Sequence, residues 1–142
     1  MRIAVVSDTH NRLPESIPPL IHDADEIWHL GDVCDERVLV TLGKLAPLRH
    51  VRGNCDDEPG WPLTLDFEIE GIRFHLEHIP TTQPPDCDIF LHGHTHVPRD
   101  ETVRGVRFLN PGCISRPKSA PPSFAWLVIE NGKLSWAVMP LR

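Results

Sequence analysis

Short, largely apolar runs in the first third of the chain limit how it can fold. Residues 3–6, 26–30 and 48–51 form three such runs. Runs of this length without regular alternation are typical of strands that are covered on both faces. The connecting segments predict two helices, a short one within residues 15–23 and one that Asp35 caps and that runs to about residue 46. The first third of the chain therefore has a β-α-β-like pattern, with helices expected on the outside of the sheet.

The rest of the chain is rich in strand signals. Apolar and polar residues alternate on either side of Glu70-Gly71, which predicts a hairpin, and Asn131-Gly132 is a strong turn signal between two later strands. The strand and hairpin signals in this part of the chain lie at residues 63–69, 72–76, 87–91, 102–109, 124–129 and 134–138. We therefore predict the α/β fold class, with two packed mixed β-sheets (a β-sandwich) flanked by a few short helices. The length of 142 residues predicts a single domain over residues 1–142.

Charge and hydropathy exclude several classes of protein. The chain has 14 basic and 20 acidic residues, a formal net charge of −6, which argues against a general nucleic-acid binder and against a polybasic membrane-surface protein. No apolar run approaches the roughly 20 residues that span a bilayer. The N-terminal apolar run is too short for a signal peptide and Asp8 interrupts it, so we expect a cytoplasmic protein.

Polar residues with metal-binding side chains follow the predicted strands. Aspartate, histidine or asparagine stands at the carboxyl end of five of them, and the residues are Asp8, His10, Asp32, Asn54, His78, His94 and His96. In open α/β sheets, ligands bind outside the carboxyl ends of the strands. The pattern therefore predicts that these seven side chains share one site.

The donor atoms of these residues favour a transition metal. Oxygen and nitrogen donors without thiolate suit Mn²⁺, Fe, Zn²⁺ or Ni²⁺ better than Ca²⁺ or Mg²⁺. Seven side chains are more than one ion normally needs, so two ions that share a bridging carboxylate are the economical interpretation. A mononuclear metal hydrolase that leaves some of the seven unused is an alternative.

The order and spacing of these motifs resemble those of the calcineurin-like metallophosphoesterases. The motifs are Asp8-x-His10, Gly31-Asp32, Gly53-Asn54-x-Asp56, His78 and Gly93-His94-Thr95-His96. The subgroup that they resemble most is the small bacterial and archaeal phosphodiesterases of the YfcE type, which carry Cys after Gly-Asn. The segment from Asn110 to Cys113, followed by Arg116, looks like the Asn-Pro-Gly-Ser segment of that subgroup. The resemblance extends over residues 3–138.

This resemblance implies a mechanism and a set of residue roles. One divalent ion would be held by Asp8, His10 and His96, the other by Asn54, His78 and His94, with Asp32 bridging the two. A hydroxide that bridges the ions would attack phosphorus in line, and the catalytic residues would be Asp32, Asn54 and His94. Asn54 and Arg116 would bind the substrate phosphate. The expected cofactors are two divalent ions, Mn²⁺ first, with Ni²⁺, Fe²⁺ or Zn²⁺ as alternatives.

The chain also departs from its relatives. Cys55 stands where many relatives have a histidine that protonates the leaving oxygen, so we expect activated phosphodiesters to be cleaved best. Relatives tend to have a helix after the fourth motif, whereas residues 81–85 are too short and too rich in proline for one. One sheet face is then less covered, and a homodimer contact could fill it.

These observations favour a metal-dependent phosphodiesterase that acts on a small phosphodiester or phosphoester substrate. The alternative is a non-catalytic protein-interaction scaffold on the same fold, as in the retromer subunit Vps29. Two other histidines have simpler interpretations: His29 is expected in the core, and His92 either supports a ligand or points away from the cluster. Trp61 either stacks on a substrate or packs beneath its loop. Cys34 and Cys113 are expected to be small side chains without a role in the site.

Overall fold

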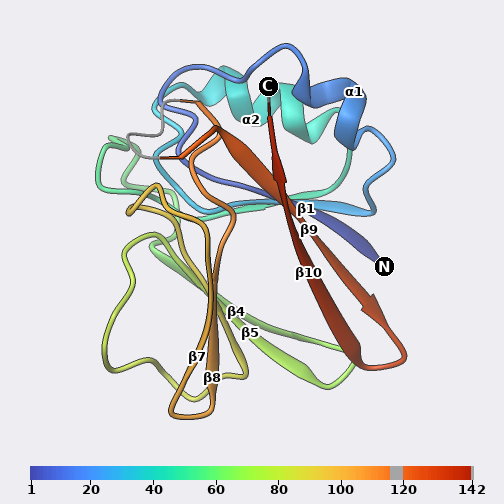
Figure 1. Ribbon diagram of the computed structural model, residues 1–142. Helices are drawn as coiled ribbons and strands as arrows, with labels where there is room; N and C mark the ends of the chain where they lie inside the picture. The colour runs from blue at the N-terminus through green and yellow to red at the C-terminus, as the bar shows by residue number, and fades with distance from the viewer. Residues whose placement is uncertain (116–119, 142) are drawn as a thin grey trace.

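The computed structural model describes residues 1–115 and 120–141, which form two five-stranded mixed sheets (Figure 1). The first sheet has the order β10-β9-β1-β2-β3, and its strands are β1 (Arg2–Val6), β2 (Glu26–His29), β3 (Leu48–His50), β9 (Ser123–Glu130) and β10 (Lys133–Pro140). The second has the order β4-β5-β6-β8-β7, and its strands are β4 (Thr64–Ile69), β5 (Ile72–Glu77), β6 (Ile89–Leu91), β7 (Arg99–Val103) and β8 (Val106–Asn110). The predicted α/β fold class with two packed mixed sheets is confirmed, and the single domain stays a prediction.

Each sheet contains three neighbouring parallel strands. β1 pairs with β2 and β2 with β3 in the first sheet, while β6 lies between β5 and β8 in the second. Antiparallel hairpin strands complete each sheet, β9 and β10 on the first and β4 and β7 on the second. The six parallel strands therefore bring six carboxyl ends, and the loops that follow them, to the site described below.

The three predicted hairpins form with tight two-residue turns. Their central pairs all have positive φ at both residues, and they are Glu70-Gly71, Arg104-Gly105 and Asn131-Gly132. Positive φ at both positions matches the right-handed twist of the strands, which is why asparagine-glycine is a strong turn signal. The tips of two hairpins also meet across the sheets, where the Gly132 amide donates to Glu70 Oε1 at 3.1 Å.

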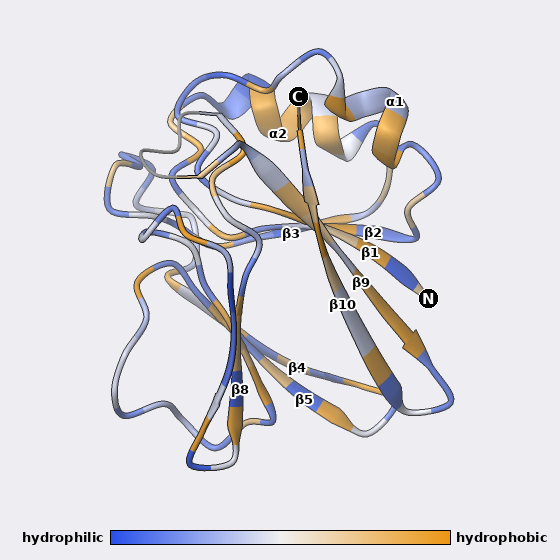
Figure 2. Ribbon diagram, in the orientation of Figure 1, coloured by the Kyte–Doolittle hydropathy of each residue, from blue (hydrophilic) through white to orange (hydrophobic). Residues whose placement is uncertain are grey.

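The core between the sheets is apolar and contains packed aromatic rings. The Trp28 ring meets the Phe74 ring edge to face at 5.2 Å and the Phe67 ring at 5.1 Å. Figure 2 shows the hydrophobic colour recurring along the strands that face this core. Because Trp28 and Phe74 are almost fully buried, they contribute most of their apolar area to holding the sheets together.

Both helices cover the outer face of the first sheet (Figure 1). They are α1 (Ile17–Ile21) and α2 (Glu36–Gly43). Asp35 caps α2 as predicted, because its side chain accepts the Arg37 amide at 3.0 Å. α2 ends at Gly43, three residues earlier than predicted. Neither helix of the described chain is long and apolar enough to cross a membrane.

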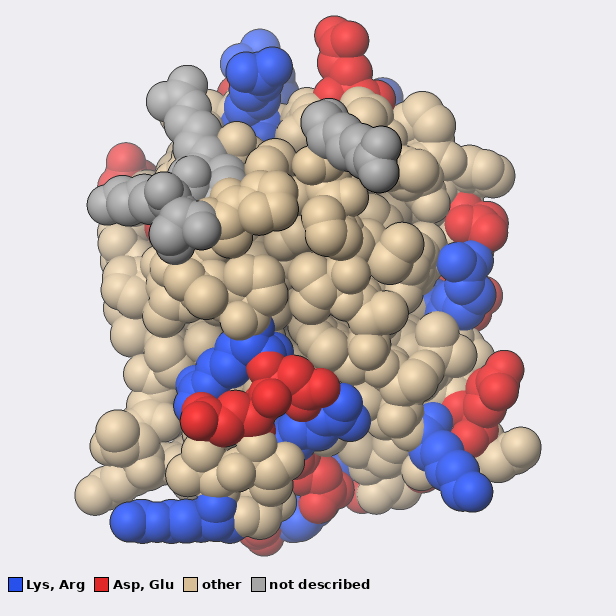
Figure 3. Space-filling model, viewed as in Figure 1, with Lys and Arg blue, Asp and Glu red and all other residues tan. Residues whose placement is uncertain are grey.

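The outer face of the second sheet carries no helix among the described residues. Residues 81–85 form an irregular loop, as predicted, and a small apolar cluster of Cys87, Phe90 and Phe108 lies on this face. Basic and acidic side chains lie side by side on the face shown in Figure 3. On the β7–β8 hairpin such pairs are Arg99 with Glu101 and Arg107 with Asp100. The homodimer contact across this face stays a prediction.

His29 is a core histidine, as expected, and both of its ring nitrogens are used. Its Nδ1 accepts the Gly31 amide at 3.1 Å, so the proton lies on Nε2, which donates to Thr9 Oγ1 at 3.1 Å. The Thr9 hydroxyl in turn donates to the Val33 carbonyl at 3.2 Å. Burial, with the nearby His50 and His78, lowers the pKa of His29 to about 3. The neutral ring therefore joins the loops that follow β1 and β2.

We predict that this buried ring makes the metal-free protein less stable in mild acid. In the unfolded chain the pKa of histidine is about 6.5, so the unfolded state binds the proton first as the pH falls. His29 alone should lower the free energy of unfolding by up to about 1.4 kcal/mol per pH unit below about 6.5, and this contribution should recover above it. Urea unfolding of the protein in EDTA between pH 7 and pH 5 measures this slope.

His29→Gln should flatten the slope, whatever its effect on stability at neutral pH. The exposed His22 provides the matched control, and His22→Gln should leave the slope unchanged. An unaltered slope in His29→Gln would show that another group carries the acid sensitivity.

Candidate metal centre

The loops after the parallel strands are bound to one another by backbone hydrogen bonds. The Asp8 amide donates to the Gly31 carbonyl at 3.0 Å, and the Gly93 amide donates to the His78 carbonyl at 3.1 Å. A further bond joins the two sheets, because the His94 amide donates to Asp8 Oδ2 at 3.3 Å. The carboxyl ends of strands from both sheets therefore meet, as the sequence predicts.

Three of the seven candidate ligands form a compact group around Asp8. Asp8 Oδ1 lies 3.2 Å from His96 Nε2 and 3.6 Å from His10 Nε2. The two imidazole Nε2 atoms are 3.4 Å apart. The structure thus brings together the three residues that were expected to hold one ion.

Asp32 lies between this group and His78. Its Oδ2 is 3.3 Å from His78 Nε2 and 3.8 Å from His10 Nε2, while its Oδ1 accepts the Cys55 amide at 2.9 Å. Burial alone would raise the pKa of Asp32, but His78, the Cys55 amide and the charge of His10 hold that pKa well below its usual range. Asp32 therefore stays ionised and lies within 3.8 Å of both imidazoles.

Asn54 and His94 lie at the exposed side of the cluster. His94 Nδ1 and Asn54 Oδ1 are 3.1 Å apart, and the His94 ring lies edge to face with the His78 ring at 5.3 Å. Three groups of described residues have candidate ligand atoms that all lie within 4.8 Å of one another, and none of the three includes His94. The second expected ligand set is thus adjacent but less compact than the first. Arg116 lies outside the described residues.

Two buried polar atoms of the cluster lack a hydrogen-bond partner, and their chemistry indicates whether the cluster suits a cation. They are Asp8 Oδ1 and His78 Nε2. The other atoms of both side chains are satisfied: Asp8 Oδ2 accepts the Ser7 hydroxyl at 2.5 Å, and His78 Nδ1 donates to the Leu30 carbonyl at 2.8 Å. Leaving such atoms unpaired is costly. A carboxylate oxygen and an imidazole nitrogen that face the same space fit a divalent cation, which would take the place of the proton on that nitrogen.

Most of the candidate ligands lie on strained backbone. Five of the seven have left-handed φ values, between 47° and 70°, and these are Asp8, His10, Asp32, His94 and His96. A non-glycine residue in this region costs on the order of 1–3 kcal/mol, and such residues cluster at functional sites. The apolar runs and motifs of the sequence do not predict this left-handed backbone at the ligand residues.

The motif glycines are required for close packing. At Gly93, which has no positive φ, an added Cβ would overlap Ser7 Oγ and would lie 2.6 Å from Asp8 Oδ2. At Gly53 it would overlap the Asp32 backbone and carboxylate. These two glycines therefore let neighbouring loops approach the carboxylates.

Sequence reasoning missed the role of Asp56. Its carboxylate accepts three backbone amides, from Gly53 at 2.7 Å, Cys34 at 2.7 Å and Asp32 at 3.0 Å. It thereby binds the loop after β2 to the loop after β3. Its place in Gly53-Asn54-x-Asp56 was the available signal, but the sequence did not indicate its partners.

The cysteines also contact the cluster more closely than expected. Cys55 Sγ lies within 4.8 Å of ligand atoms of His10 and Asp32. Cys34 Sγ is 3.9 Å from His10 Nδ1, and Cys113 Sγ donates to the Asp8 carbonyl at 3.4 Å. Both cysteines thus touch residues of the cluster, and the expectation that they have no role in the site stays a prediction.

His92 points away from the cluster and towards the outer face of the second sheet. Its Nδ1 donates to the Gly93 carbonyl at 2.9 Å, and Nε2 accepts Arg99 Nη1 at 3.2 Å. It supports the backbone of the ligand loop and contacts no ligand side chain in these bonds. Trp61 packs edge to face against His50 at 5.0 Å, which agrees with its packing interpretation.

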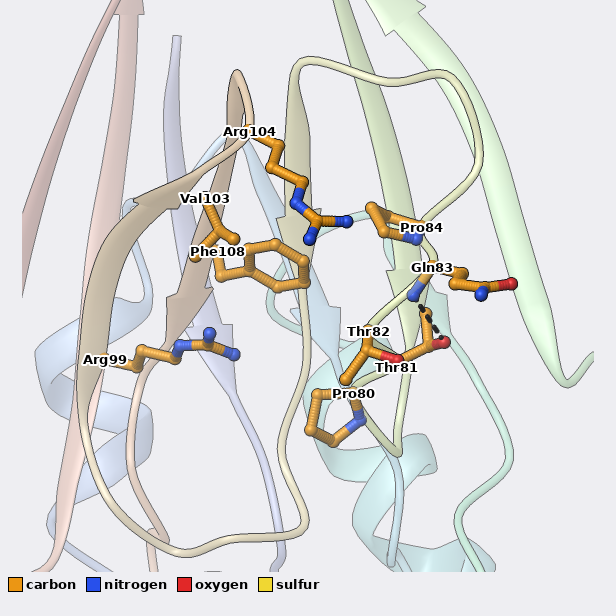
Figure 4. Close-up of a pocket in the computed structure, with 9 residues that line it drawn as sticks. All are labelled: Pro80, Thr81, Thr82, Gln83, Pro84, Arg99, Val103, Arg104 and Phe108. Atoms are coloured by element: carbon orange, nitrogen blue, oxygen red, sulfur yellow. Dashed lines mark hydrogen bonds between the residues drawn. The ribbon is translucent and has the colours of Figure 1, made fainter.

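A cavity of about 530 Å³ lies next to Arg99, between residues 80–84 and the β7–β8 hairpin. Figure 4 shows the Arg99 and Arg104 side chains extending towards that loop, with the Phe108 ring between them. Arg99 is already bound to Glu101 and His92. This cavity contains none of the seven candidate ligands.

We predict that Asp56→Ala weakens metal binding about 10- to 100-fold. The substitution leaves three amides of the ligand loops without an acceptor, and loss of such supporting contacts typically has an effect of this size. Calorimetric titration of the metal-free protein with Mn²⁺ measures it. The neighbouring exposed residue gives the control, and Asp57→Ala should bind as the natural protein does. Equal affinities for Asp56→Ala and the natural protein would contradict the supporting role.

Comparison with known proteins agrees with this geometry. The profile of the "Calcineurin-like phosphoesterase superfamily domain" matches residues 1–132. A protein from Methanothermobacter thermautotrophicus, named a probable metallophosphoesterase, is 33% identical over 153 aligned positions, which cover 94% of this chain and 89% of that protein.

Solved structures agree as well. Yfce, a phosphoesterase from E. coli, aligns with a TM-score of 0.79 and 26% identity over the whole of both chains. Vps29 from Entamoeba histolytica, solved in complex with zinc, aligns with a TM-score of 0.79 and 24% identity over 99% of each chain, a likeness that shows the fold alone. By its sequence profile, its relatives and its fold, the chain belongs to the calcineurin-like phosphoesterase superfamily.

Proposed function

We propose that this protein is a metal-dependent phosphoesterase that hydrolyses phosphodiester bonds, with activated diesters preferred. The observation that carries the proposal is the pair of buried, unpartnered atoms, Asp8 Oδ1 and His78 Nε2, which face Asp32 in a cluster of oxygen and nitrogen donors. Membership of the superfamily supports it. The proposed substrate is a small phosphodiester or phosphoester.

The proposed site holds two divalent ions, with Mn²⁺ the first candidate and Ni²⁺, Fe²⁺ or Zn²⁺ the alternatives. The residues proposed for one ion are Asp8, His10 and His96, those proposed for the other are Asn54, His78 and His94, and Asp32 would be shared by both. Such ions supply Lewis acidity, which lowers the pKa of water and offsets charge on phosphoryl oxygens.

The other proposed contribution of the chain is to position the metal ligands and the substrate phosphate. The Asn54 side chain is exposed at the cluster, so its amide nitrogen can donate to a phosphate oxygen. His78 Nδ1 donates to the Leu30 carbonyl, and this hydrogen bond orients the ring so that Nε2 faces Asp32. The proposal needs no side chain as a general base, because bound ions would lower the pKa of water.

A protein-interaction scaffold on the same fold is the second candidate function, because Vps29 shares the fold. Surface recognition gives no reason for a buried carboxylate oxygen without a partner or for five strained residues around it. The cluster therefore favours the phosphoesterase.

The direct test measures bound metal per chain and the hydrolysis of bis-p-nitrophenyl phosphate with added Mn²⁺, Ni²⁺, Zn²⁺ or Mg²⁺. We expect turnover with at least one transition metal and a loss of about 100-fold or more in Asp32→Asn, because the shared carboxylate contacts both ions. Asp57→Asn serves as the matched control and should keep full activity. No turnover with any metal, or turnover that Asp32→Asn does not reduce, would refute the proposal.

We further predict that Cys55→His increases activity selectively. An imidazole has a pKa near neutrality and donates a proton to a poor leaving group better than a thiol does, a contribution that is typically about 10²–10⁴-fold. The gain in kcat/KM should therefore rise along a series of diesters with increasing leaving-group pKa. Cys55→Ser, which has no such donor, is the control. An equal gain on all members of the series would count against this role of residue 55.

A further inference from the structure

A groove on one side of the metal cluster has features of a binding site for an apolar group. It has a volume of about 220 Å³, and Asn54 and His78 of the cluster form part of its lining. This volume is below the roughly 300 Å³ at which typical drug-sized ligand pockets begin, and so suits one ring or a short alkyl chain. The groove is thus continuous with the residues proposed to hold metal and phosphate.

The walls of this groove are unusually apolar for exposed positions. The exposed fraction is 57% for Leu63 and 46% for Ile79, and both side chains line the groove. Leu63 immediately precedes β4 and Ile79 follows β5, and the strands are paired so that Thr64 lies opposite Glu77. The two side chains therefore lie at the same end of one hairpin, where an apolar ligand would cover both.

Charge distinguishes this side of the cluster from the opposite one. Arg52 lines the groove, and the carboxylate of Glu77 is bound to His75 Nε2 at 2.8 Å. A second groove, next to Cys55, is lined by five carboxylates, those of Asp35, Glu36, Asp56, Asp57 and Glu58. An anionic phosphate ester is therefore accommodated better on the side of Leu63 and Ile79.

We propose that the groove formed by Leu63 and Ile79 binds an apolar substituent, an aryl or short alkyl group, of the phosphate ester whose phosphate lies at Asn54. This inference rests on the proposed function and deepens it by naming the class of substrate. Leu63 and Ile79 act as specificity-determining residues, since burial of their exposed side chains by an apolar group strengthens binding without altering the metal cluster.

The test compares two probes with the same anionic head, phenylphosphonate and methylphosphonate, on the metal-loaded protein. Binding is followed by NMR of the methyl groups, with Zn²⁺ or Mg²⁺ as the bound ion because both are diamagnetic. We expect phenylphosphonate to bind at least about tenfold more tightly and to shift the methyl signals of Leu63 and Ile79. In a Leu63→Ser, Ile79→Ser double variant the preference should fall below about threefold, with methylphosphonate affinity unchanged.

The matched control is Val40→Ser, which removes a similarly exposed apolar side chain on α2 and should keep the full preference. An unchanged preference in the double variant, or no preference in the natural protein, would overturn the inference and leave the proposed function standing. Failure of both phosphonates to bind the metal-loaded protein would instead contradict the proposed function, and this inference with it.

Kinetics with two diesters identify which ester substituent occupies the groove. Bis-p-nitrophenyl phosphate and methyl p-nitrophenyl phosphate both release p-nitrophenol. They differ only in the substituent that stays on the phosphate, which is p-nitrophenyl in the first and methyl in the second. A loss of kcat/KM in the double variant for the first substrate alone assigns the groove to the retained group, and an equal loss for both assigns it to the leaving group. A loss for neither would overturn the inference.

Discussion

The buried carboxylate of Asp8 is the contact on which the site depends. Its Oδ2 accepts the Ser7 hydroxyl and the amide of His94, so one oxygen joins the end of β1 to the ligand loop of the other sheet. Its Oδ1 is left without a hydrogen-bond partner and faces three imidazoles. A charge in that position is tolerated only where compensating groups surround it. The two sheets thus meet around a carboxylate that is matched to a cation.

The strained loops around this carboxylate are stabilised by the rest of the fold. The left-handed conformations at the ligand residues oppose folding, as does the close approach of Gly53 and Gly93 to the two carboxylates. The sandwich core, with Trp28 packed against Phe74, supplies the opposing apolar burial. Asp56 and His29 then fix the loops through hydrogen bonds to their backbone and to Thr9. Apolar burial in the core therefore offsets the unfavourable backbone conformations at the carboxyl ends of the parallel strands.

The sequence predicts the elements well and the geometry of the site only in part. Apolar runs and turn residues identify the ten strands and two helices of the described residues, because strand burial and tight turns are determined by local pattern. The convergence of seven polar residues follows from the direction of parallel strands. The bonds of Asp56 to the amides of Asp32 and Cys34 could not be predicted, since they join segments distant in the sequence. The same holds for the contact of Cys113 with Asp8. The sequence leaves the orientation of His92 open because this residue follows the last residue of β6. In the structure its ring lies near the Phe90 ring and contacts Arg99.

Metal binding and folding should be coupled in this protein, because the candidate ligands come together only in the folded state. Asp8 and Asp32 are both almost fully buried within one cluster, and each lies within 3.8 Å of His78 Nε2. In the unfolded chain these ligands are far apart in sequence and do not form a site. A cation that binds the cluster therefore stabilises the folded state by an amount that grows with the logarithm of its free concentration above Kd. The hairpin ends of the sheets gain nothing directly from the ion, because turns and apolar burial hold them. A bound metal ion would therefore stabilise the carboxyl ends of the parallel strands, where the strained residues lie and where the proposed substrate would be positioned.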